Sequence, residues 1–225
     1  GCDRDMSGKA KAGMGVVGED IDDDGDVDVI VCNLVGEADS LYENRDGRFV
    51  DIAGRAGIAS ASRRFTRFGL TLADFDNDGV RDLFEATGRV GTRDPAFGID
   101  PYAEPNVLLR GNGDGSFSEV PAIASETPRT SRAAVVLDVN NDGGLDLLII
   151  NREAPAALLI HRAQTTNHWV TLDIRDANGA PALGATMVAS VKGRTIHRFV
   201  HTDGSYSAAS DPRLHVGLGD ATSLN

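Results

Sequence analysis

The chain has 225 residues, of which 41% are hydrophobic and 25% are charged, and its formal net charge at pH 7 is -12. This length suffices for one or two domains with a buried core. The negative charge argues against a nucleic-acid partner, because proteins that bind phosphate backbones present basic surfaces. No apolar run reaches the roughly 18 residues that a membrane-spanning helix needs, so we expect no insertion into a membrane.

The first part of the chain contains both cysteines. The sequence starts at Gly1 rather than at a methionine and shows no signal peptide, so we expect a processed or trimmed product. Cys2 and Cys32 can pair or stay free. Cys32 lies in the apolar run of residues 28–33, where a small buried core residue is a better interpretation than a disulfide partner.

A nine-residue acidic pattern begins at residue 20 and returns at residues 74 and 138. Every copy has oxygen-bearing side chains at positions 1, 3, 5 and 9 and a glycine at position 6. Carboxylates crowded in this way repel one another unless a cation lies among them. Ca²⁺ prefers six to eight oxygen ligands at about 2.3–2.6 Å, and the glycine permits the sharp bend around it. The pattern predicts up to three structural calcium ions.

The predicted ligands are the side chains at positions 1, 3, 5 and 9 and the backbone carbonyl at position 7, with water completing the shell. They are Asp20, Asp22, Asp24, Asp26 and Asp28 in the first loop, Asp74, Asp76, Asp78, Val80 and Asp82 in the second, and Asp138, Asn140, Asp142, Gly144 and Asp146 in the third. Asn140 removes one negative charge, so we expect the third loop to bind more weakly. Metal-free turns are the alternative, since Asp and Gly favour turns, but turns alone do not explain the fixed spacing.

The loops belong to a longer repeat, because their first residues are 54 and then 64 residues apart. A small residue stands five positions before each loop: Gly15, Gly69 and Ala133. Strand-like runs follow the loops at residues 29–31, 83–84 and 147–150. Residues 41–49 and 108–117 predict strand pairs around Asp-Gly turns, and residues 158–160 match their first half. Short strands at this period are typical of β-propeller blades.

Residues 89–104 lengthen the second repeat and are rich in Gly, Pro and charge, which predicts a surface insertion of the kind that carries binding loops. From about residue 167 the pattern changes. Strict alternation at residues 168–174 and 214–218 indicates half-buried strands, and residues 185–191 and 195–201 are also strand-like. We expect His197 and His201 to face solvent on one strand.

The predicted fold class is all-β. About three blades of an incomplete propeller ring occupy residues 1–165, and a small all-β module occupies residues 166–225.

An EF-hand is the main rival for the second loop, because Glu85 stands at its position 12. The corresponding residues of the other copies are Val31 and Ile149, and the flanks read as strands rather than helices. The loops are therefore better placed in β-hairpins. No nucleophile elbow, protease-like context or phosphate-binding glycine loop is present, so we expect no catalytic activity.

With these residues identified, the chain resembles FG-GAP/VCBS-repeat proteins, whose blades carry Phe-Gly before a D-x-D-x-D-G-x-x-D loop. Phe68 and Gly69 stand before the second loop in this way, Met14 and Gly15 keep half of the signature, and Arg132 and Ala133 have lost it. The tail resembles the ASPIC/UnbV domain of acidic secreted cartilage proteins. Its most specific part is Gly204-Ser205-Tyr206 followed by Ser210 to Gly219.

The resemblance implies a calcium-binding protein that is secreted, at the cell surface or periplasmic and that mediates adhesion or matrix contacts. Closed propellers need about four to eight blades, so we expect a fragment whose partners include the rest of the propeller. An unknown protein or glycan ligand is the other expected partner.

The leading hypothesis is thus a non-enzymatic, calcium-stabilised scaffold. The alternative is an accessory domain of a secreted or periplasmic enzyme, in which the loop metal is purely structural or assists hydrolysis.

Overall fold

The computed structural model describes residues 4, 8–91, 100–121, 127–162 and 165–225. These residues form antiparallel sheets and one short helix, α1 (Ile58–Ser62), and the sheets close into no barrel among them. The all-β fold with an incomplete set of propeller-like blades is confirmed. Cys2 and residues 92–99 of the predicted insertion lie outside the described part of the chain. No helix in that part is long and apolar enough to cross a membrane.

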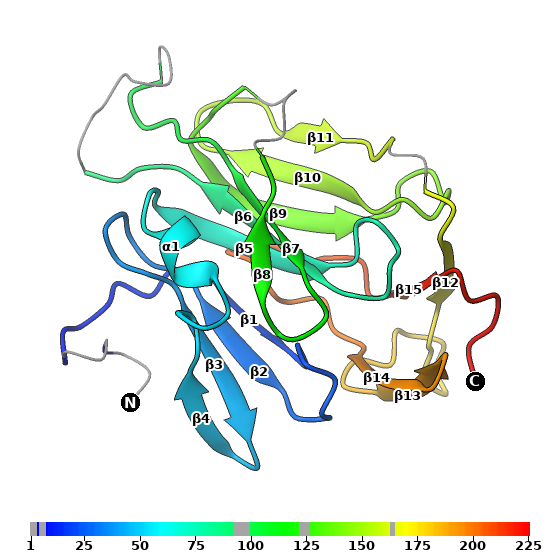
Figure 1. The fold of residues 1–225 in the computed structure, drawn as a ribbon. Helices are drawn as coiled ribbons and strands as arrows, with labels where there is room; N and C mark the ends of the chain where they lie inside the picture. The colour runs from blue at the N-terminus through cyan, green and yellow to red at the C-terminus, as the bar shows by residue number, and fades with distance from the viewer. Residues whose placement is uncertain (1–3, 5–7, 92–99, 122–126, 163–164) are drawn as a thin grey trace.

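The first blade is a four-stranded antiparallel sheet in chain order (Figure 1). Its strands are β1 (Val16–Glu19), β2 (Asp28–Val31), β3 (Ser40–Arg45) and β4 (Arg48–Asp51). The predicted Asp-Gly turn joins β3 to β4, with Asp46 and Gly47 at φ of 54° and 84°, as the tight hairpin turns of twisted strands require.

The second blade repeats this order, and the third has three strands. The second blade consists of β5 (Arg67–Ala73), β6 (Asp82–Thr87), β7 (Val107–Gly111) and β8 (Phe117–Glu119). The third consists of β9 (Ser131–Leu137), β10 (Asp146–Asn151) and β11 (Ala157–Leu159). In every blade the acidic loop connects the first strand to the second.

The first strands of the blades, β1, β5 and β9, lie next to one another. The close contact between these strands explains the small residue that precedes each loop. A Cβ atom on Gly15 would lie 1.9 Å from the carbonyl oxygen of Phe68, and one on Gly69 would lie 2.7 Å from the Cα atom of Ala133. The backbones therefore approach so closely that only small side chains fit between neighbouring blades.

Apolar side chains fill the spaces between blades. One core lies between the first two blades and includes Ile30, Leu41, Leu70 and Leu83, none more than 1% exposed. A second core lies between the second and third blades and includes Phe84 and Ile149. Cys32 belongs to the first core and is fully buried, as expected for a small core residue.

The remaining strands form two antiparallel pairs with a small core of their own. β12 (His168–Leu172) pairs with β15 (Leu214–Gly219), and β13 (Thr186–Val191) pairs with β14 (Arg194–Phe199). We refer to residues 166–225 as the C-terminal module. Its strands lie beside the ends of the blades that carry the acidic loops (Figure 1).

The C-terminal module also covers the edge of β9. The hydroxyls of Ser205 and Ser210 accept hydrogen bonds from the backbone N–H groups of Ala134 and Val136 at 3.1 and 3.3 Å. The ring of Tyr206 meets Phe68 edge to face, with centroids 5.3 Å apart. The unpaired N–H groups of an open edge strand can pair with another chain. Here the serine hydroxyls of the module bind two of these N–H groups.

Candidate metal-binding site

The three acidic loops share one backbone conformation. The residue at position 4 adopts a positive φ in each copy, 61° at Asp23, 59° at Asn77 and 56° at Asn141. The glycine at position 6 does the same, with φ between 83° and 98°. Asn, Asp and Gly are the residues that tolerate this region best, so local sequence dictates the fold of each loop.

The carboxylate at position 1 binds the loop's own backbone. Asp20 accepts hydrogen bonds from the N–H groups of Asp24 and Gly25 at 3.1 and 2.9 Å. Asp74 and Asp138 accept the equivalent bonds from positions 5 and 6 of their own loops. This carboxylate closes the loop in all three copies.

The carboxylate at position 9 ties the loop to the third strand of its blade or, in the third blade, to the residues just after that strand. Asp28 accepts hydrogen bonds from the N–H groups of Ile21 and Asn44 at 3.0 and 2.8 Å. Asp82 accepts from Phe75 and Gly111, and Asp146 accepts from Val139 and His161. The position is thus structural in every blade, and its role as a metal ligand stays a prediction.

Positions 1, 3 and 5 bring their oxygens together in the first two loops. One oxygen each of Asp20, Asp22 and Asp24 lies within 4.8 Å of the others, and Asp74, Asp76 and Asp78 form the same group. Asp28 and Asp82 are not part of these groups. In the third loop the amide of Asn140 donates to Asp142 at 2.7 Å. The carbonyl ligands at Asp26, Val80 and Gly144 stay a prediction.

Crowding and burial disfavour the ionised state of several carboxyl groups in the first two loops. Burial raises the pKa of Asp74 to about 7, and the charges of Asp78 and Asp76 add to that effect. Burial likewise raises the pKa of Asp28 and Asp82 to about 6, and that of Asp22 in the same direction. These groups oppose ionisation in the ion-free chain, and a bound cation favours it.

The side chain that faces the loop from the third strand differs between blades. In the second blade Arg110 lies 2.9 Å from Asp76 and 2.8 Å from Asp78, so that its guanidinium balances part of their charge. The matching position of the first blade is Glu43, whose charge raises the pKa of Asp22 further. The third strand therefore presents a cation to the second loop and a carboxylate to the first, and this carboxylate is itself paired with Arg45 and Arg55.

Position 4 of each loop contacts the C-terminal module, a role that the sequence analysis missed. Asp23 pairs with Arg198 at 2.9 Å and also with Arg194. The amide oxygen of Asn77 lies 2.6 Å from His215 Nε2. Arg213 donates to the side chain of Asn141 at 2.9 Å. An Asp or Asn at this position is typical of a residue with a positive φ. No nearby sequence feature predicts its partner in the C-terminal module.

The glycines at position 6 also lie against the C-terminal module. A Cβ atom on Gly143 would meet the indole ring of Trp169 at 1.8 Å, and one on Gly79 would lie 3.3 Å from the carbonyl oxygen of Gly217. A Cβ on Gly25 would lie 3.4 Å from His197. The same glycine therefore permits the bend and the close approach of the module.

The expectation that His201 faces solvent is wrong. Its Nε2 lies 2.7 Å from Glu19 and its Nδ1 lies 2.6 Å from Asp203. The hydrogen bond and charge of Glu19 raise the pKa of His201 to about 9. Arg81, in the acidic loop of the second blade, pairs with the same Glu19 at 2.7 Å. Glu19, in the first blade, therefore contacts both the second blade and the C-terminal module.

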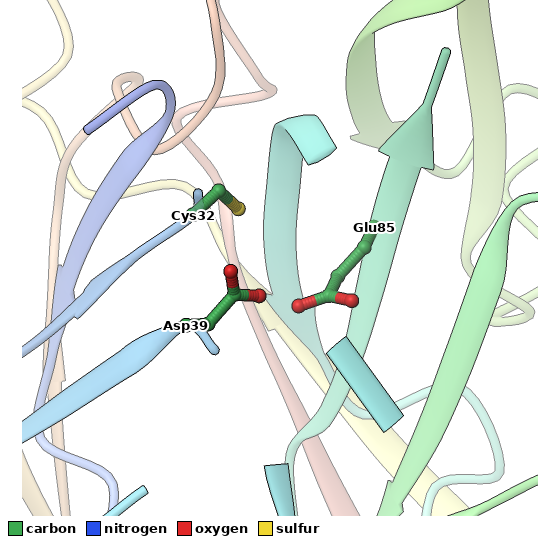
Figure 2. Close-up of side chains that lie close together, drawn as sticks. All are labelled: Cys32, Asp39 and Glu85. Carbon is green, nitrogen blue, oxygen red and sulfur yellow. The ribbon is translucent and has the colours of Figure 1, made fainter. Parts of the chain in front are cut away.

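Glu85 does not complete an EF-hand. It lies in β6, fully buried, and groups with Cys32 and Asp39 rather than with the second loop (Figure 2). Burial raises its pKa well above the ordinary value, and the adjacent Asp39 carboxylate adds to the effect. The hairpin interpretation of the loop agrees with the strands on both sides.

Family models match both parts of this arrangement. A model described as an FG-GAP-like repeat matches residues 20–85 and 96–149, which contain all three acidic loops. The chain belongs to the FG-GAP-like repeat family. A second model, described as ASPIC and UnbV, matches residues 175–225, within the C-terminal module. The two resemblances expected from the sequence are confirmed.

Three relatives share the name cartilage acidic protein 1. The protein of Homo sapiens is 30% identical over 84% of this chain, that of Mus musculus is 30% identical over 92%, and that of Xenopus tropicalis is 29% identical over 87%. The chain spans 32–38% of the length of these relatives.

Proposed function

We propose that this chain is a calcium-stabilised segment of an extracellular β-propeller and serves as a non-enzymatic scaffold. The observation that carries the proposal is the recurrence of one hydrogen-bonding scheme in three loops, with carboxylate oxygens converging in two of them. Hydrogen bonds to the backbone account for positions 1 and 9, and position 5 also accepts the N–H of position 7 in each loop. These bonds do not explain why the carboxylate oxygens of positions 1, 3 and 5 converge in two loops, and a hard cation supplies a reason.

The proposed place of action is outside the cytoplasm, in a secreted, cell-surface or periplasmic protein. Calcium affinities of about 10⁻⁴–10⁻³ M suffice there, because calcium is abundant outside cells. The relatives are named for cartilage and for acidity, and the net charge of -12 matches the second of these. The proposed role is adhesion or ligand binding rather than catalysis.

The proposed partners are the remaining blades of a longer propeller and a protein or glycan ligand. The relatives are about three times as long as this chain, since it spans 32–38% of them. Three blades do not close a ring, and known rings have about four to eight.

Thermal melting with calcium, magnesium or chelator tests the proposal. A ligand at 100 times its dissociation constant stabilises the fold by about 2.7 kcal/mol per site, which raises Tm by about 5–10 °C in a chain of this size. We expect calcium to raise Tm and magnesium at equal concentration to raise it less. The double variant Asp22→Asn/Asp76→Asn should lose most of the effect, and Asn178→Asp in a distant turn should keep it. A Tm that chelator leaves unchanged would contradict the proposal.

A further inference from the structure

Cys32, Asp39 and Glu85 form a buried cluster between the first and second blades (Figure 2). Cys32 directly follows β2, Asp39 directly precedes β3, and Glu85 lies within β6. Cys32 and Asp39 thus sit at the end of the first blade opposite its acidic loop. One ligand atom of each residue lies within 4.8 Å of the others, and all three residues are 0% exposed.

Glu85 points its carboxyl group into this cluster, where the carboxyl group of Asp39 lies within hydrogen-bond reach. Among the described residues, no N–H or hydroxyl donor reaches either of its two buried oxygens. The nearby cation, Arg67, directs its Nε to Asp39 at 3.0 Å and its Nη2 to Asp39 and to the carbonyl oxygen of Glu37. Its Nη1 donates to the carbonyl oxygen of Phe65. A buried carboxyl group in this situation must be neutralised by a proton or by a cation.

The charge balance of the cluster fits one divalent ion. In the ion-free chain, burial keeps Cys32 a neutral thiol, and a proton on Glu85 leaves the charges of Asp39 and Arg67 balanced. With a divalent ion bound, the cluster is neutral when both Cys32 and Glu85 have lost their protons, since three negative charges then face the ion and Arg67. A dication engages all three groups at once and displaces the protons of the thiol and of Glu85 into solvent.

The donor set selects the kind of ion. A thiolate sulfur favours zinc and similar transition metals over calcium and magnesium, which take oxygen ligands. Tetrahedral zinc with these ligands separates the donor atoms by about 3.5 Å, a spacing that atoms within 4.8 Å of one another can reach by side-chain rotation. The three side chains supply three of the four ligands of such an ion, and a water molecule would supply the fourth.

We propose that Cys32, Asp39 and Glu85 bind one structural transition-metal dication of the zinc class between the first two blades. The ion joins β2 and β3 of the first blade to β6 of the second. This site is separate from the acidic loops and does not depend on calcium binding to them.

Refolding tests this site, because a fully buried ion enters while the chain folds. Cys2 is replaced by serine in every sample, so that Cys32 is the only thiol. The chain is refolded with Zn²⁺ in the presence of excess Ca²⁺ and dialysed, and its zinc content is measured by mass spectrometry. A parallel sample refolded with Co²⁺ is examined for the thiolate-to-cobalt charge-transfer band in the near ultraviolet.

We expect one equivalent of zinc and a charge-transfer band in the Cys2→Ser protein. Cys32→Ser should abolish the band, and Glu85→Gln should abolish stoichiometric retention. Asp74→Asn, in the second acidic loop, should leave both readouts unchanged. Circular dichroism verifies that each variant folds. If Cys32→Ser does not fold, Glu85→Gln, which keeps the shape of the side chain, tests whether zinc binding depends on the cluster. Native refolding without bound zinc, or one zinc retained in both site variants, overturns the proposal. The first of these outcomes would assign Glu85 a proton shared with Asp39 instead.

Discussion

Among the side chains predicted as ligands, at positions 1, 3, 5 and 9, only position 3 differs in charge between the three loops. It is Asp22 in the first loop and Asp76 in the second, but Asn140 in the third, where its amide donates to Asp142. An amide offers one oxygen without a formal charge. The third loop therefore lacks the attraction that a carboxylate at position 3 would exert on a cation a few ångströms away. The third loop should therefore be the weakest of the three that share this backbone.

Replacing Asn140 with aspartate tests that ranking. We expect Asn140→Asp to raise the calcium affinity of the third loop about tenfold, which corresponds to about 1.4 kcal/mol. Isothermal titration calorimetry measures the change. Asn178→Asp adds the same charge in an exposed turn of the C-terminal module and should leave the affinities unchanged. Equal effects of the two substitutions would mean that general charge, rather than ligation, governs binding.

The raised pKa of Asp74 predicts how calcium stabilisation depends on pH. Its pKa is about 7 in the folded, ion-free chain and about 4 when unfolded. A group with a raised folded pKa contributes stability below the unfolded value, and this contribution is lost as the pH rises through about 7. Calcium binds the ionised carboxylate and offsets that loss. The increase in Tm caused by calcium should thus be larger at pH 8 than at pH 5, and an equal increase at both would contradict the assignment of Asp74 as a ligand.

At the scale of the strands, the packing of blades depends on the small residues of β5 and β9. A Cβ on Gly69 would lie 2.7 Å from the Cα atom of Ala133, and backbone atoms cannot rotate out of the way. We expect Gly69→Ala to lower the free energy of unfolding by about 1–3 kcal/mol, the usual cost of overpacking. Urea denaturation measures it. Gly54→Ala is the matched control, since a Cβ there meets no atom within 4 Å, and its effect should stay within about 0.5 kcal/mol.

The strands and loops could be predicted from sequence because their causes are local. The spacing of Asp20 to Asp28 and the alternation at residues 168–174 each reveal an element without reference to distant parts of the chain. The strand pair around Asp46 and Gly47 was predictable for the same reason, since its turn residues specify its geometry.

Contacts between elements distant in sequence could not be predicted in this way. Asp23 meets Arg198 across 175 residues, and His201 meets Glu19 across 182. Glu85 was correctly excluded from an EF-hand, but its neighbours Cys32 and Asp39 come from another blade. Such contacts arise from how blades and module pack, and a short sequence window contains no sign of them.

At the scale of the whole molecule, the acidic loops form the surface on which the C-terminal module rests. Positions 4 and 6 of all three loops contact the module, while the oxygens of positions 1, 3 and 5 converge in the first two loops. An ion that fixes a loop therefore also fixes part of the docking surface. Calcium binding and docking of the module should be thermodynamically coupled, so that each favours the other.

Trp169 reports that coupling, because it is the single tryptophan of the sequence. It packs against Gly143 of the third loop and stacks on His215, with ring centroids 5.9 Å apart. Trp169 is 38% exposed in the docked module. Removing calcium should loosen the third loop and expose the indole further to water, which shifts its fluorescence emission to longer wavelength. Calcium should reverse the shift, and magnesium at the same concentration should do so less.

Loop variants distinguish local coupling from general unfolding. Asp142→Asn, in the third loop, should weaken the fluorescence response to calcium, whereas Asp22→Asn, in the first loop, should preserve it. Far-ultraviolet circular dichroism recorded in parallel should show that the strands persist during the shift. If both variants lost the response together with their strand signal, calcium would control folding of the whole chain rather than docking of the module on the third loop.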